Sequence, residues 1–92
     1  MLPGSLVSMP PLLHFVASWA SAICGLHVSE VSVAAGRLGA SVITVDIDEH
    51  PELAREYGVP NVPSVAVEGF PSSLVVGARS ADALVEILRS LA

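Results

Sequence analysis

The chain has 92 residues, of which 52% are apolar and 14% charged, so it fits one small folded domain and is too apolar for a disordered segment. Nine acidic residues against four basic ones give a net charge of −5, and the absence of a basic cluster argues against a nucleic-acid partner. The single cysteine excludes an internal disulfide and a multi-cysteine zinc site, and it suits a reducing compartment such as the cytoplasm.

The N-terminal third has no charged residue before Glu30, so a signal peptide or a membrane segment has to be considered. However, there is no positively charged start, and Pro10, Pro11 and Trp19 interrupt the apolar run. We therefore expect no membrane partner. Residues 1–11 contain three prolines and a glycine, which predicts an irregular segment before a folded domain over residues 12–92.

The first two elements are a strand and a long helix. The apolar run Leu12–Ala17 is typical of a strand buried on both faces of a sheet. A helix is expected from about residues 20–22 to Leu38, and Gly39 is typical of a helix end. Apolar residues recur along this helix at spacings of three and four and predict its buried side: Val28, Val31, Ala35 and Leu38.

The second half predicts a strand, a helix, a hairpin and a last helix. Residues 41–47 form a second buried strand, parallel to the first because a helix connects them. Pro51 begins a helix that ends at Gly58, and two strands over 64–68 and 73–76 enclose a hairpin loop. Ser80 is expected to cap the last helix, whose core-facing residues are Leu84, Ile87, Leu88 and Leu91. This order predicts an α/β fold with a four-stranded mixed sheet flanked by helices.

Two motifs resemble the thioredoxin family. The segment Leu13–Ala20 reads Leu-His-Phe-Val-Ala-Ser-Trp-Ala and resembles the family's active-site corner. Residues 58–64 read Gly-Val-Pro-Asn-Val-Pro-Ser and resemble the family pattern Gly-Ile-x-x-Ile-Pro-Thr, in which the second proline is cis. The resemblance implies a thioredoxin-like fold, with the N-terminal strand and helix shortened or missing, and a cis bond before Pro63.

The chain departs from the family where the dithiol belongs. A thioredoxin continues after its tryptophan with Cys-Gly-Pro-Cys, whereas Ala20 follows Trp19 here. An ungapped count places Ile23 at the second cysteine position and Cys24 one residue later. His14 stands where typical thioredoxins have a buried Asp.

His14 and Ala20 together resemble the N-terminal thioredoxin-like domain of multidomain monothiol glutaredoxins. That resemblance implies a non-catalytic recognition or adaptor domain in a monothiol-glutaredoxin or redox-homeostasis system. In those proteins an iron–sulfur cluster and glutathione are bound by a separate glutaredoxin domain, which is marked by the motif Cys-Gly-Phe-Ser. We therefore expect no cofactor on this chain.

The resemblance also implies a binding patch made of Trp19, Ala20, Val62 and Pro63. Such a shallow apolar patch would bind a protein or peptide partner, or glutathione, through edge pairing and side-chain contacts. The alternative is that Pro63 only shapes its turn. A peptide-binding module like the redox-silent domains of protein disulfide isomerases would use the same patch.

Cys24 and His14 are the residues with candidate chemistry. Dithiol exchange needs a second thiol, and the sequence has none. Cys24 could still act as a single-cysteine, glutathione-linked redox centre; the alternative is a buried, small apolar side chain. His14 is either a proton shuttle or a neutral, hydrogen-bonded core residue. We expect His27 and His50 to be solvent-facing or capping residues, and the histidines have no metal-site spacing.

Overall fold

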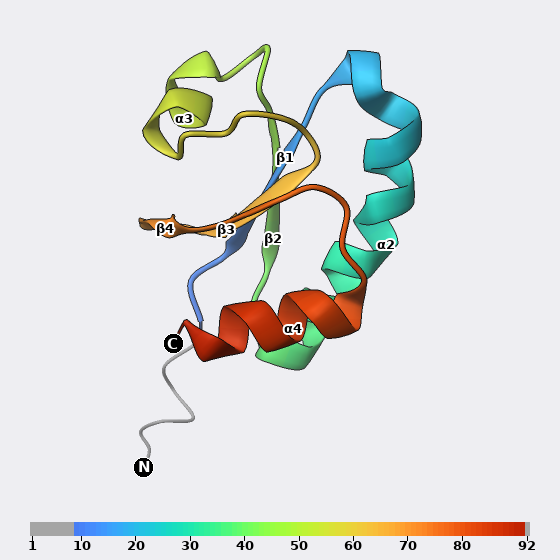
Figure 1. Cartoon of the computed structure of the whole chain (residues 1–92), viewed down its shortest axis with the longest axis vertical. Coiled ribbons are helices and arrows are strands. Elements are labelled where there is room, and N and C mark those ends of the chain that lie inside the picture. The colour runs from blue at the N-terminus through green and yellow to red at the C-terminus, as the bar shows by residue number, and fades with distance from the viewer. Residues whose placement is uncertain (1–8, 92) are drawn as a thin grey trace.

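The computed structural model describes residues 9–91 (Figure 1). Residues 1–8 of the predicted irregular segment lie outside the described residues, and residues 9–11 have no regular structure. The strands are β1 (Leu12–Val16), β2 (Val42–Asp46), β3 (Ser64–Val67) and β4 (Phe70–Val76). The helical elements are the 3-10 turn η1 (Ser18–Ala20), α2 (Ser21–Leu38), α3 (Pro51–Glu56) and α4 (Ala81–Ser90).

In residues 9–91 the strands form one four-stranded sheet in the order β2-β1-β3-β4. β1 and β2 are parallel because α2 carries the chain back along the sheet between them. β3 is antiparallel to both β1 and β4, and Gly69, with φ at 89°, forms the tight turn between β3 and β4. The predicted four-stranded mixed sheet flanked by helices is therefore confirmed.

Helices lie on both faces of the sheet (Figure 1). α2 and α4 share one core cluster with alternate residues of the strands, among them Leu12 and Val65. A second cluster lies on the opposite face, where Leu13 and Phe15 pack with Tyr57 at the end of α3. The alternation of side chains along β1 explains why this central strand is buried on both faces. None of the helices in residues 9–91 has the length and apolarity needed to cross a bilayer.

Two strand predictions were wrong in detail. β2 is an edge strand rather than a strand buried on both faces: Val45 is buried, but Ile43 is 42% exposed. β4 begins at Phe70, inside the predicted loop. Pro71 has no backbone N–H to donate, which an edge strand tolerates. The Val67 N–H donates instead to the Ser73 hydroxyl at 2.7 Å.

The predicted buried sides of α2 and α4 are correct in most positions and wrong in a few. α2 buries Cys24, His27, Val31, Ala34 and Ala35. Of the expected side, Val31 and Ala35 are buried and Leu38 packs against the core, whereas Val28 is 47% exposed. In α4 Leu91 is exposed and Val85 takes a place in the core. The Ser80 hydroxyl accepts the Ala83 N–H at 3.2 Å, so the predicted cap of this helix is confirmed.

Candidate functional site

Three loops lie close together at the end of the sheet where the central strand β1 finishes. The turn with Trp19 follows β1 directly, and Pro63 precedes β3, whose first residue Ser64 pairs with Phe15 near the end of β1. The Gly77 N–H donates to the Pro63 carbonyl at 2.9 Å, which places the loop before α4 beside them. The topology thus gathers segments that are far apart in the sequence.

The predicted patch residues lie together in this region but differ in exposure. The Trp19 side chain is 65% exposed and Ala20 is half-buried, whereas Val62 and Pro63 are buried. The Val62–Pro63 peptide bond is cis. The Val62 N–H, which edge pairing with a peptide would use, donates to the Asn61 side-chain oxygen at 3.0 Å. Of the four residues, Trp19 therefore provides most of the accessible side-chain surface.

Two apolar side chains that sequence reasoning did not select extend the surface of Trp19. Ile23 is 48% exposed and Leu26 is 79% exposed. Ile23 and Leu26 follow the i, i+3 spacing of one face of α2, and Trp19 lies in the turn η1 directly before this helix. We call Trp19, Ile23 and Leu26 the Trp19 surface. The sequence did contain a sign of this surface. The helix has more apolar residues than one buried side can hold, so some of them had to face solvent.

A groove of about 480 Å³ borders this surface, between α2 and the loop before α4. Ile23 and Leu26 form one wall, and Ala78 and Arg79 belong to the other. Among residues 9–91 the exposed Arg79 side chain makes no ion pair and donates only to the Val76 carbonyl, at 3.4 Å.

The groove has a second charged residue, Glu30, whose carboxylate makes a hydrogen bond within the protein. The Glu30 carboxylate accepts the Ala81 N–H, at the N-terminus of α4, at 2.8 Å. Glu30 keeps its negative charge in that contact but is half-buried, whereas the Arg79 side chain is exposed, so the Arg79 guanidinium is the more accessible of the two charges that line the groove.

Cys24 lies beneath the surface rather than on it. It is the fourth residue of α2, is 4% exposed, and packs in the cluster that contains Phe15 and Tyr57. Its neighbour in sequence, Ile23, is the exposed one. A reagent or partner therefore reaches the thiol only if the start of α2 moves.

His14 and His27 form a buried pair, so the expectation that His27 faces solvent was wrong. The two side chains are 1% and 2% exposed, and His27 Nδ1 lies 3.3 Å from His14 Nε2. The other ring nitrogen of His27, Nε2, lies 3.0 Å from the backbone nitrogen of Arg79 and 3.1 Å from the backbone carbonyl oxygen of the same residue. His50 is exposed, with Nδ1 at 3.4 Å from the Glu52 carboxylate.

Burial disfavours the charged form of both rings of the pair. Desolvation, followed by the charge of His27, lowers the pKa of His14 to about 4. Desolvation also lowers the pKa of His27, against the opposing effects of the Arg79 backbone and Glu30. Within residues 9–91 no group of three or more His, Cys, Asp or Glu side chains is arranged to hold a metal ion.

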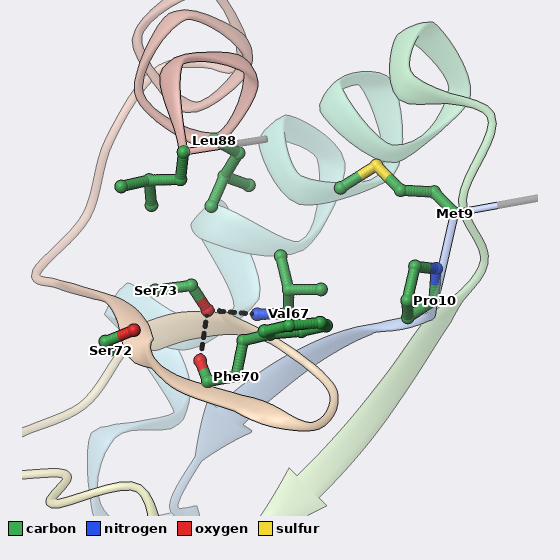
Figure 2. Close-up of a pocket in the computed structure, with 8 residues that line it drawn as sticks. Met9, Pro10, Val67, Phe70, Ser72, Ser73 and Leu88 are labelled. Carbon is green, nitrogen blue, oxygen red and sulfur yellow. Dashed lines mark hydrogen bonds between the residues drawn. The ribbon is translucent and has the colours of Figure 1, made fainter.

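An apolar pocket of about 390 Å³ lies at the other end of β1. Figure 2 shows the Ser73 hydroxyl, which accepts the Val67 N–H and donates to the Phe70 carbonyl at 2.6 Å. Both hydrogen-bonding roles of this hydroxyl are thus filled. The wall is otherwise mainly apolar: Met9, Pro10, Val67, Phe70, Leu88 and Leu91, with Ser72 and Ser73. This pocket offers apolar contact rather than chemistry, and the length of β1 separates it from Trp19.

Comparison with known proteins identifies the fold. No family model matches the sequence, and no curated protein matches it. Among solved structures, thioredoxin 1 from Thermosipho africanus TCF52B superposes with a TM-score of 0.68 at 14% identity, over 88% of this chain and 92% of that one.

Two malarial structures are similar as well. Thioredoxin-2, described as a component of the malaria parasite protein secretion machinery, gives a TM-score of 0.66 at 20% identity, over 86% of this chain and 80% of that one. A structure described as a malarial protein gives 0.65 at 21% identity, over 86% and 92%. The thioredoxin-like fold expected from the sequence is thereby confirmed.

Proposed function

We propose that this thioredoxin-like fold is a recognition domain that binds a protein segment with apolar side chains and a carboxylate, and that it does not exchange disulfides. The observation that carries the proposal is a contrast at one corner of the fold. Large apolar side chains at Trp19, Ile23 and Leu26 are exposed there, while the only thiol of the sequence is buried.

The chemistry of the partner follows from the groove. Exposed tryptophan and arginine are the residue types that contribute most to protein binding, because each offers a large contact area and a polar or charged group. Apolar side chains of the partner would cover the Trp19 surface. A carboxylate would pair with the Arg79 guanidinium, which has no ion-pair partner among residues 9–91.

The finer setting rests on resemblance. His14 and Ala20 resemble the N-terminal domain of multidomain monothiol glutaredoxins, and this supports an adaptor role in such a system or in redox homeostasis. The single cysteine supports a cytoplasmic location. The rival proposal, a single-cysteine enzyme that forms a mixed disulfide with glutathione, needs a Cys24 thiol that glutathione can reach. Its 4% exposure favours the recognition domain.

Selection from a random peptide library tests the proposal. We expect enriched peptides to combine apolar residues with Asp or Glu. Leu26→Asp should weaken their binding by about tenfold or more, because a desolvated apolar contact is replaced by a charge. Arg79→Glu should move the selection from acidic to basic peptides.

The matched control is Val28→Asp, since Val28 is an exposed apolar residue on the other side of α2. This variant should bind the enriched peptides as the wild type does. Binding that is insensitive to Leu26→Asp, or an enrichment of basic peptides by the wild-type protein, would refute the proposal.

A further inference from the structure

The two buried histidines are connected to the groove by contacts with the loop that contains Arg79. His14 lies on β1 in the centre of the sheet, and His27 on α2 links it to the backbone of Arg79. Arg79 lies between Gly77 and the capping residue Ser80, and it belongs to the wall of the groove beside Ile23 and Leu26. The chain of contacts therefore runs from the protein interior to the proposed binding surface.

The contacts of His27 Nε2 suit two protonation states. When this nitrogen carries no proton, it accepts the Arg79 N–H at 3.0 Å. When it carries a proton, it donates to the Arg79 carbonyl at 3.1 Å. One proton bridges His27 Nδ1 and His14 Nε2 at 3.3 Å. In the cation it is on His27 Nδ1 while Nε2 is also protonated, whereas a neutral His27 with its proton on Nε2 accepts the bridging proton from His14.

The same geometry limits the pair to one added proton. A second proton would place an N–H of each ring opposite the other, at 3.3 Å in a buried site. The pKa values agree with this order, because that of His14 is lowered to about 4 while the Arg79 backbone and Glu30 partly oppose the decrease for His27.

Few other charges face the pair. The strand neighbours of His14, Thr44 on β2 and Val65 on β3, carry no charge. On the helical side Glu30 of α2 acts on His27, and its carboxylate holds the Ala81 N–H of α4. The Arg79 guanidinium contacts the Val76 carbonyl instead of the rings.

We propose that the His14–His27 pair is a proton-dependent switch, which exchanges the Arg79 N–H contact for the Arg79 carbonyl contact and so changes the groove beside Ile23 and Leu26. One proton from solvent binds His27 Nε2, no covalent bond breaks, and the ring becomes a cation. As a regulation of partner binding, the switch rests on the proposed function.

An NMR titration of the free protein from about pH 7.5 to about pH 4.5 tests the switch, since this range covers the ordinary histidine pKa. The ring nitrogens of His27, the Arg79 amide and the methyl signals of Ile23 and Leu26 should shift with one shared midpoint below 6.5. The methyl signals of Ile43, on the edge strand β2, are the matched control and should not follow.

Variants separate the pair from other titrating groups. His27→Gln should abolish the shared shift, whereas His50→Gln, at an exposed histidine, should leave it unchanged. If His27→Gln does not fold, the wild-type titration still decides. A His27 ring that titrates without the Arg79 amide and the groove methyls, or that does not titrate in this range, overturns the switch. Because this measurement uses no peptide, its failure and a failure of peptide binding are distinguishable.

Discussion

His14 illustrates how a buried residue links stability to pH. The folded protein holds its pKa at about 4, whereas the unfolded chain has the ordinary value of 6.5. Between these values the unfolded state binds more protons than the folded state, so the free energy of unfolding rises with pH across this window. The contribution is complete above about pH 6.5 and is lost as the pH falls toward 4.

The expected size of this loss follows from the difference in pKa. Each pKa unit corresponds to about 1.4 kcal/mol, so His14 should cost the folded state about 3 kcal/mol at the acidic end of the window. Urea denaturation at a series of pH values measures it. His14→Gln should flatten the dependence between about pH 5 and 6.5, and His50→Gln should not. A wild-type stability that is constant over that range would contradict the assignment.

The role of His14 as a buried residue was one of two alternatives open from the sequence, but its partner was not predictable. His27 is a polar residue in a helix, and such residues usually face solvent. Its burial depends on a contact thirteen residues away and on the backbone of Arg79, which is brought close by tertiary structure alone. Spacing within one segment carries no information on such contacts.

At the scale of elements, the extent of the helix α2 and the C-terminal half of its buried side were predictable, but the buried positions of its first half were not. Its ends at residues 21 and 38 agree with the expected range, because Gly39 with φ at 71° stops the helix. Its apolar residues lie on nearly all sides, so two neighbouring stripes fitted the pattern. Packing on the sheet buries Cys24 and His27 in the first half of the helix and leaves Val28 partly in solvent.

Two matched leucine substitutions, one in each of the long helices, test which helix residues are buried. Leu84 of α4 is fully buried, so Leu84→Ala should lower the free energy of unfolding by about 2–5 kcal/mol through lost burial and a cavity. Leu26 is 79% exposed, and Leu26→Ala should change stability by no more than about 0.5 kcal/mol. Chemical denaturation measures both. A loss of more than about 2 kcal/mol in Leu26→Ala would mean that α2 packs through a different side.

At the scale of the whole molecule, the sequence predicted the order of elements and the sheet, since crossovers and turns limit the topologies that strands can adopt. It did not predict which strand is an edge. β2 reads as a buried strand because it is apolar, yet nothing in residues 9–91 pairs with its outer side. Edge positions depend on what lies beside a strand in space, which its own residues do not encode.

The global arrangement also determines what Cys24 can do. In the fold it is buried in one cluster with Phe15 and Tyr57, while its neighbour in sequence, Ile23, is exposed. The Trp19 surface lies beside Ala20, the residue that the sequence resemblance places where a thioredoxin has its attacking cysteine. The proposed function therefore depends on this thiol staying inaccessible while the apolar side chains around it remain exposed.

The rate at which iodoacetamide modifies Cys24, with glutathione disulfide labelling read by intact mass, tests this account most directly. In the folded protein we expect alkylation at least about a hundredfold slower than in the urea-unfolded protein, since reaction of a buried thiol requires a local opening that costs about 3 kcal/mol or more. We also expect no glutathione adduct at neutral pH. Alkylation as fast in the folded as in the unfolded protein, together with one glutathione per chain, would contradict the recognition domain and favour the single-cysteine enzyme.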